Sequence, residues 1–147
     1  RERKHAGFEL KRFLFEHLSL SGHEVRDMGA KKYDPEDDYP DFISLAAKEV
    51  AREPGAFRGI VIGGSGEGEA ICANKFYGVR AAVYYGGNTD IVRLSREHND
   101  ANVLALGARF LSPGDALNAV NLWLTTPFSG DERHKRRIAK LFNIAHK

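Results

Sequence analysis

The chain has 147 residues, of which 42% are hydrophobic and 29% charged; this fits a single domain over residues 1–147 and excludes disordered and collagen-like proteins. The chain has 22 Lys and Arg and 20 Asp and Glu, so its net charge is +2. This balance of charges argues against a nucleic-acid binder. No apolar run approaches the roughly 18 residues of a transmembrane helix, so no membrane partner is expected. With one cysteine and no segment resembling a secretory signal, we expect a cytoplasmic protein.

The first part of the chain predicts two amphipathic helices with a strand between them. Apolar residues at helical spacing indicate the first helix, which a Ser-Gly pair ends because glycine accepts a left-handed cap cheaply. A Tyr-Pro-Asp sequence starts the second helix, since proline is tolerated in a first helical turn. The predicted elements are a helix over about 7–20, a strand over 23–29, an acidic loop over 31–38 and a helix over about 39–52.

The rest of the chain alternates short apolar strands with helices. Gly59-Ile60-Val61-Ile62 is apolar throughout, which is typical of a strand buried on both faces of a parallel sheet. The alternation predicts an α/β fold with a mostly parallel sheet and helices on both faces. The predicted strands cover 59–62, 79–85 and 102–106, and the predicted helices cover 70–76, 89–97, 113–124 and 131–144.

The beginning of the chain is irregular for such a fold. A fold of this kind usually begins with a strand, whereas this chain begins close to the helix that should follow it. Residues 1–4 are Arg, Glu, Arg and Lys, without an apolar lead-in. We therefore expect the first strand to be missing, or altered to what remains in residues 1–4.

A glycine-rich loop, Gly63-Gly64-Ser65-Gly66-Glu67-Gly68-Glu69, joins a buried strand to a helix. In open parallel sheets, ligands bind outside the carboxyl ends of the strands, where this loop lies. Glycines let backbone N–H groups surround a phosphate or a developing oxyanion. The spacing is neither that of a P-loop nor that of a dinucleotide fingerprint. A tight turn that merely needs glycine is the alternative.

Two acids of this loop are candidate general bases. A carboxylate in a cleft flanked by glycine backbone can act as a base with a raised pKa, and Glu69 and Glu67 both fit. Capping by the helix dipole also explains an acid at a helix start. The spacing does not separate the two acids.

His98 and Asn99 follow a predicted helix and precede a strand, at or near a carboxyl-end crevice. His98 can donate or accept a proton near neutrality, and Asn99 offers an amide donor to an oxyanion. A helix C-cap is the alternative, because both residue types favour helix ends.

Several cations are candidate phosphate ligands. Arg133 and Arg137 are four residues apart, so on a helix they share one face and can hold one phosphate. The same run can be a solvated basic surface or a weak nucleic-acid patch. His5 at a helix start could face an anion or lie at the surface. Arg109 follows a strand and carries no signal of its own, and Cys72 is interpreted as a packing residue.

Taken together, these segments resemble the type B ribose-5-phosphate isomerase family, which also includes galactose-6-phosphate isomerase subunits. They occur in the family's order and span nearly the whole chain. The resembling segments are His5-Ala6-Gly7-Phe8-Glu9-Leu10-Lys11, Asp38-Tyr39-Pro40-Asp41, Gly63 to Glu69 with Ala73-Asn74-Lys75, Gly78-Val79-Arg80-Ala81, Arg96 to Leu104, and Arg133-His134 with Arg137.

The resemblance implies a Rossmann-like fold and an aldose–ketose isomerase of sugar phosphates that needs no metal or organic cofactor. It also implies a homodimer, or a tetramer, with the active site at the subunit interface. One branch of the family uses a Cys at the position of Gly63 as its base, and the other uses the final Glu of the glycine loop. This chain matches the second branch, which selects Glu69 over Glu67.

The resemblance also implies a role for each site residue. Glu69 is the base and His98 assists ring opening. Asn99 and the loop backbone stabilise the enediolate, Ser65 binds the sugar, and cations hold the phosphate, some of them from the partner subunit. The implied substrate-binding residues are His5, Gly64, Ser65, Gly66, Glu67, Gly68, Asn99, Arg109, Arg133 and Arg137.

One position departs from the family. Members carry an Asp directly before the His-Ala-Gly triplet, where this chain has Lys4.

The expected activity is the isomerisation of ribose 5-phosphate and ribulose 5-phosphate in the pentose phosphate pathway. The alternatives are an isomerase of a six-carbon phosphate, such as galactose or allose 6-phosphate, and a sugar-phosphate-binding homologue with impaired turnover.

Overall fold

The computed structural model describes residues 6–30 and 32–145, and its centre is a three-stranded parallel sheet. The strands are β1 (Gly59–Gly63), β2 (Ala81–Tyr84) and β3 (Val103–Gly107), in the spatial order β1-β3-β2. Val103 is the register partner of both Gly59 and Ala81. The strand starts therefore form one edge of the sheet, the amino edge, and their ends at Gly63, Tyr84 and Gly107 form the carboxyl edge.

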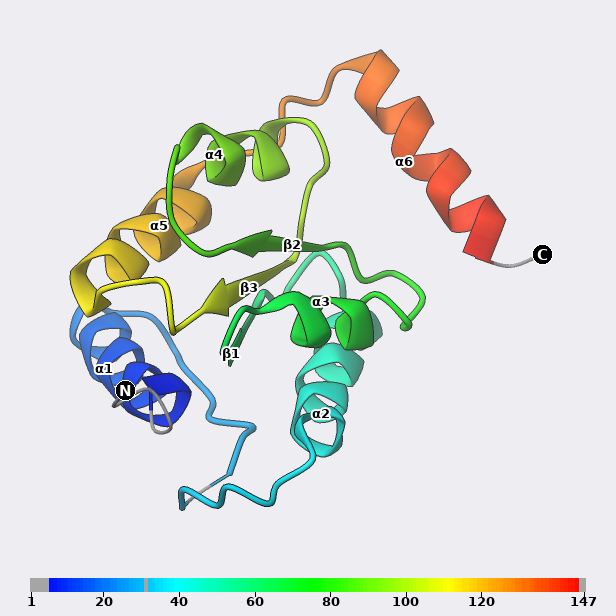
Figure 1. Ribbon diagram of the computed structural model, residues 1–147. Coiled ribbons are helices and arrows are strands. Elements are labelled where there is room, and N and C mark those ends of the chain that lie inside the picture. The colour runs from blue at the N-terminus through cyan, green and yellow to red at the C-terminus, as the bar shows by residue number, and fades with distance from the viewer. Residues whose placement is uncertain (1–5, 31, 146–147) are drawn as a thin grey trace.

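Helices cover both faces of this sheet, so the predicted three-layer α/β architecture is confirmed (Figure 1). α1, α4 and α5 pack with Leu104 and Leu106 in one core, and α2 and α3 pack with Val61 and Ala105 in the other. The helices are α1 (Ala6–Leu20), α2 (Tyr39–Arg52), α3 (Glu67–Ala73), α4 (Asp90–Glu97), α5 (Pro113–Thr125) and α6 (Glu132–Ala145).

The central strand β3 is buried at every residue, which explains its unbroken apolar sequence. Its side chains alternate between the two cores, with Leu104 on one side and Ala105 on the other. Burial of these side chains on both faces is the main apolar contribution to stability at the centre of the fold. Among the described residues, no helix is long and apolar enough to cross a membrane.

The strand predicted over residues 23–29 is wrong, since this segment joins no ladder. The described chain places no strand between it and β1, so its backbone groups have no sheet partner. Lys11 instead holds the segment from α1, with Nζ 2.6 Å from the Ala30 carbonyl oxygen and 3.2 Å from Asp27. The expectation that the first strand is missing is compatible with this arrangement, because the described chain begins with α1; residues 1–4 lie outside the described residues.

Two further boundaries differ from the prediction, and at the first of them side chains replace backbone partners. The strand predicted from Val79 starts at Ala81, since Asn102 Oδ1 accepts the N–H of Arg80 (2.8 Å) and Asn74 Oδ1 accepts that of Ala81 (2.8 Å). The helix predicted over 70–76 is α3, which begins three residues earlier, inside the glycine loop.

Candidate active site

The glycine loop lies directly on the carboxyl end of β3. Gly66 has φ +84°, and a Cβ there would lie 3.1 Å from the carbonyl carbon of Leu106. A Cβ on Gly107 would approach the Ser65 carbonyl oxygen to 2.6 Å. Because the backbones meet this closely, both positions require glycine, and the loop is held against the sheet edge.

Glu69 places a carboxylate inside this loop. It is the third residue of α3, and only 8% of it is exposed. Its carboxyl group lies over Gly63, so that a Cβ on Gly63 would overlap the carboxyl atoms. The described ion pairs and hydrogen bonds leave Glu69 without a cation, and the N-terminal turn of α3 supplies the nearest favourable dipole. The site thus presents one buried carboxylate at the carboxyl edge.

Glu67 has a different environment. Its side chain is exposed, and its backbone N–H donates to Ser65 Oγ (3.2 Å), which orders the first turn of α3. Of the two acids that the sequence left open, only Glu69 is removed from water.

Arg109 brings a cation to the same edge. The backbone N–H of Arg109 donates to the Gly64 carbonyl oxygen (3.0 Å), and the backbone N–H of Ala108 donates to the Gly63 carbonyl oxygen (2.8 Å). Its side chain is exposed, and a Cβ on Gly64 would lie 3.2 Å from Arg109 Nε. An anion held by this guanidinium would lie beside the glycine loop.

Tyr39 also reaches the loop, although the sequence analysis gave it no role beyond a helix start and a segment that resembles the family. A Cβ on Gly68 would lie 2.5 Å from Tyr39 Oη, so the phenol packs against the glycine backbone. The signal that the sequence offered was an aromatic residue at the first position of the predicted helix, directly before Pro40. In the structure its side chain is about half exposed.

His98 and Asn99 lie at the other edge of the sheet, which differs from the expected crevice position. His98 is the C-cap of α4, and β3 starts five residues later. Because α4 returns from the carboxyl end of β2 to the amino end of β3, its C-terminus lies at the amino edge. A five-residue strand separates the two edges by roughly 13 Å. Asn99 is exposed.

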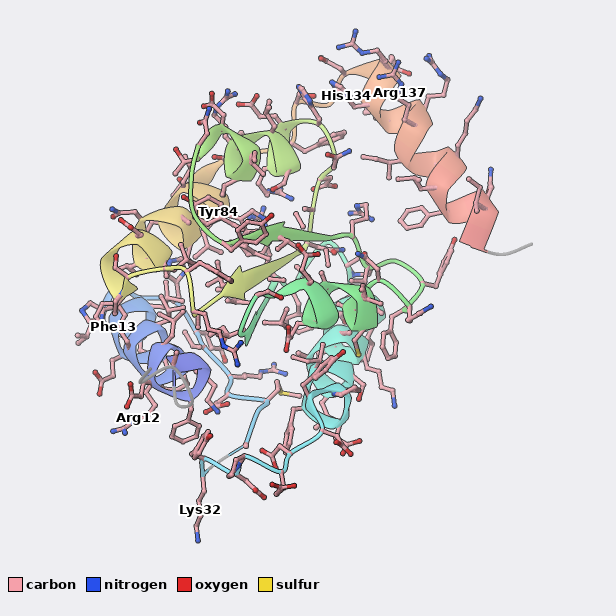
Figure 2. All side chains as sticks on the ribbon, in the orientation of Figure 1. Arg12, Phe13, Lys32, Tyr84, His134 and Arg137 are labelled. Carbon is pink, nitrogen blue, oxygen red and sulfur yellow. The ribbon has the colours of Figure 1, made fainter. Side chains whose placement is uncertain are left out.

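The start of α6 joins this second cluster. His134 stacks on His98 with ring centroids 4.3 Å apart and planes 17° apart. Burial lowers the pKa of His134, and the neighbouring His98 and Arg133 lower it further. Arg133 and Arg137 are exposed, and Figure 2 shows His134 and Arg137 at the end of the molecule away from α3.

The candidate residues therefore form two groups within one chain. The carboxyl-edge group contains the glycine loop, Glu69 and Arg109, and the amino-edge group contains His98, Asn99, Arg133 and Arg137. His5 lies outside the described residues. The described part of the chain contains no group of three His, Cys, Asp or Glu side chains placed to hold a metal ion.

Comparisons with known proteins identify the family. The sequence profile of the Ribose/Galactose Isomerase family matches residues 3–141. Ribose-5-phosphate isomerase B of Mycobacterium leprae is 48% identical over 134 residues, which cover 91% of this chain and 81% of the relative.

Solved structures agree with this match. A structure of ribose-5-phosphate isomerase B from Mycoplasma genitalium with bound ribulose-5-phosphate superposes with a TM-score of 0.91 at 37% identity, covering 97% of this chain and 92% of the other. The Clostridium thermocellum isomerase gives 0.87 at 44% identity, covering 97% and 93%. The chain belongs to the Ribose/Galactose Isomerase family.

Proposed function

We propose that this chain interconverts ribose 5-phosphate and ribulose 5-phosphate, with Glu69 as the base that moves a proton between C2 and C1. Family membership and the 48% identity to the Mycobacterium leprae isomerase support the reaction. The single observation that carries the assignment of the base is the buried Glu69 carboxylate, placed over Gly63 inside the glycine loop.

The chemistry requires one carboxylate that removes a proton and returns it. In the aldose-to-ketose direction, Glu69 takes the proton from C2 and an enediolate forms. The proton on O2 passes to O1, and the same carboxyl group returns its proton to C1, which leaves the carbonyl at C2 and a hydroxyl at C1. General base catalysis contributes about 10²–10⁴-fold.

The packing at Gly63 supports Glu69 over a base at the strand end. Any side chain at position 63 would occupy the space of the Glu69 carboxyl group. A base at position 63 and a base at position 69 in this conformation therefore exclude each other.

The carboxyl edge also supplies binding groups. Donors for the enediolate oxygens would come from the backbone of residues 64–68, and losing one such donor typically costs about 10²–10³-fold in rate. Ser65 would bind the sugar, and Arg109, beside Gly64, would contact the phosphate.

We further propose that the active site is completed by a second copy of the chain. His98, Asn99, Arg133 and Arg137 lie at the amino edge, so they can meet Glu69 only if a twofold axis brings the two edges of different subunits together. α6 stands apart from the three layers (Figure 1), with Leu141 and Ile144 exposed, as expected for a helix that packs on a partner.

The test is the formation of ribulose 5-phosphate from ribose 5-phosphate by Glu69→Gln. We expect kcat to fall by about 10²–10⁴-fold with little change in KM, because the amide keeps the shape but accepts no proton. Glu16→Gln on the exposed side of α1 is the matched control and should retain wild-type rates. Wild-type kcat in Glu69→Gln would refute the base assignment. Faster turnover of galactose or allose 6-phosphate would reassign the substrate.

A further inference from the structure

The turn that carries His98 and Asn99 ends in a left-handed residue. Asp100 has φ +48°, a conformation that residues with a side chain adopt uncommonly. Such a conformation persists where the surrounding contacts hold it. The contacts that hold this turn therefore also set the direction of the His98 and Asn99 side chains.

Arg80, directly before β2, supplies several of these contacts. Its Nε donates to the carbonyl oxygens of Asn99 (3.1 Å) and Asp100 (3.0 Å), and its Nη2 lies 3.5 Å from Asp100 Oδ2. The backbone N–H of Arg80 donates to Oδ1 of the buried Asn102 (2.8 Å), which fixes the arginine at the start of the sheet. Because only 14% of the Arg80 side chain is exposed, its contacts with the turn are largely shielded from water.

The same guanidinium also supports α6. Cζ of Arg80 lies 5.3 Å from the centroid of the Phe142 ring, within the range of a cation–π contact. Tyr77 packs on the same ring, with the two centroids 5.2 Å apart. Arg80 therefore contacts both the turn after α4 and the second half of α6.

The face of α6 that these contacts hold is defined by three residues. His134, Ile138 and Phe142 are four residues apart, so they share one side of the helix, and none of them is exposed. His134 is fixed near the helix start by its ring stack, and Phe142 is fixed about two turns later. These two anchors set the rotation of α6 about its axis, and with it the direction of Arg133 and Arg137.

We propose that Arg80 is a positioning residue, which holds the turn of His98 and Asn99 and the arginines of α6 in one fixed arrangement. It contacts no reacting atom and acts through the groups that do. This role rests on the proposed function, since that function assigns the turn to ring opening and the enediolate, and the arginines to the phosphate.

Arg80→Met tests this role, because it keeps an apolar side chain and removes every donor. We expect kcat for ribose 5-phosphate to fall by about 10–100-fold, since small displacements of catalytic groups are costly. KM should rise by about three- to tenfold, because the phosphate ligands lose their fixed direction. Unchanged kcat and KM in a folded Arg80→Met variant would overturn the proposal.

Arg58→Met is the matched control. Arg58 precedes β1 as Arg80 precedes β2, donates to the carbonyls of Trp123 (3.2 Å) and Leu124 (3.4 Å), and lies 5.5 Å from the Trp123 ring. It has the same kinds of contact without touching the turn or α6, so its variant should keep the wild-type kcat and KM. Equal losses in both variants would show a general effect of removing such an arginine and would overturn the proposal.

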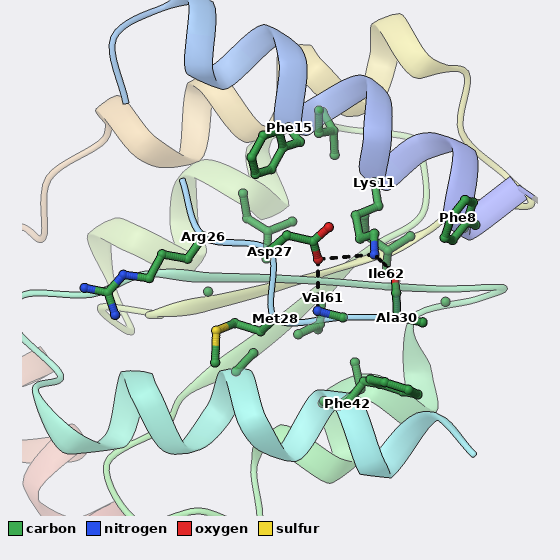
Figure 3. Close-up of a pocket in the computed structure, with 18 of the residues that line it drawn as sticks. Phe8, Lys11, Phe15, Arg26, Asp27, Met28, Ala30, Phe42, Val61 and Ile62 are labelled. Atoms are coloured by element: carbon green, nitrogen blue, oxygen red, sulfur yellow. Dashed lines mark hydrogen bonds and ion pairs between the residues drawn. The ribbon is translucent and has the colours of Figure 1, made fainter. Parts of the chain in front are cut away.

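Phe142→Leu separates the two contacts of Arg80. It removes the ring on α6 and leaves the hydrogen bonds to the turn, so KM should rise by about three- to tenfold while kcat is kept. Phe57→Leu is the control, since Phe57 also lies beside guanidinium groups, those of Arg26 (5.1 Å) and Arg52 (5.6 Å). Phe57 and Arg26 line the pocket between α1 and α2 (Figure 3), and the described residues that line it include none from α4 or α6. An unchanged KM in Phe142→Leu would overturn the link from Arg80 to α6.

NMR spectra of the His98 and His134 ring protons give a readout that does not depend on turnover. The ring stack shifts these resonances upfield, and Arg80→Met should reduce the shift whereas Arg58→Met should not. Unaltered resonances in a folded Arg80→Met variant would overturn the positioning role. Absence of ribose 5-phosphate turnover in the unmodified chain would instead refute the proposed function, and the NMR comparison would still decide the role of Arg80.

Arg80→Lys covers the case in which Arg80→Met does not fold, as thermal melting will show. The lysine keeps a cation beside Asp100 but lacks the planar set of donors, so we expect a folded variant whose kcat is still lowered by about tenfold or more. Wild-type kcat in Arg80→Lys would mean that charge alone is sufficient and would overturn the proposal.

Discussion

The two edges of the sheet hold their candidate residues in different ways. At the carboxyl edge, Glu69 is buried and fixed by close backbone packing around Gly63 and Gly66. At the amino edge, His98 is held by a ring stack on His134, and the arginines of α6 point into solvent. The first group is organised by the chain itself, whereas the arginines of the second group are exposed and make no contact that fixes a substrate within this chain's described residues.

Gly63→Ala gives the largest expected effect, because it changes the packing around Glu69 at the carboxyl edge directly. The new Cβ overlaps the Glu69 carboxyl group and must displace it, so we expect kcat to fall by about 10²–10⁴-fold, as in Glu69→Gln. Gly114→Ala is the matched control, since a Cβ there meets nothing within 4 Å. Steady-state kinetics of both variants measures the difference. Near-normal turnover in Gly63→Ala would show that the position of Glu69 is not critical.

Arg96→Met tests what supports the amino edge. The buried guanidinium donates to the carbonyls of Thr126 (3.0 Å) and Ala101 (2.7 Å) and to Asp100 (2.8 Å), which joins the turn after His98 to the segment before α6. Leaving these acceptors unpaired should lower the free energy of unfolding by about 2–5 kcal/mol.

Arg93→Met is the comparison for this loss, because Arg93 makes ion pairs with Asp90 and Glu97 that are much more exposed than those of Arg96. Such pairs contribute less than about 1 kcal/mol. Urea unfolding of both variants gives the difference, and equal midpoints would mean that the buried contacts of Arg96 do not stabilise the fold.

Mixing two defective variants tests whether the edges meet between subunits. Arg137→Ala should raise KM for ribose 5-phosphate by about 10–100-fold, since a charged hydrogen bond to phosphate contributes about 1.5–3 kcal/mol. If each site takes Glu69 from one copy and Arg137 from the other, hybrids of Glu69→Gln with Arg137→Ala contain one intact site. Activity at low substrate should then rise on mixing. No recovery in demonstrated hybrids would place both residues in the same subunit's site.

The smallest effect concerns pH. Because the pKa of His134 is lowered in the folded protein, the unfolded chain takes up more protons as the pH falls toward and below about 6.5. The stability contributed by the His98–His134 stack is therefore complete above that pH and decreases as the pH falls. Amide exchange at the start of α6 should quicken between pH 7 and 5. His134→Phe, which keeps a ring but does not titrate, should remove the part of this pH dependence that comes from position 134.

The sequence by itself determined the helices, the parallel sheet and the glycine loop, because periodicity and glycine spacing are local properties that each segment carries alone. The unbroken apolar run at β3 and the stripe of α1 are of this kind. Only the tertiary structure decided that Glu69 is buried while Glu67 is exposed, that His98 lies at the amino edge, and that residues 23–29 form no strand. These outcomes depend on the arrangement of segments that are distant in the sequence. Glu69 is buried because it packs over the end of β1 at Gly63, and His98 lies at the amino edge because α4 returns there. Residues 23–29 form no strand because no described strand pairs with them.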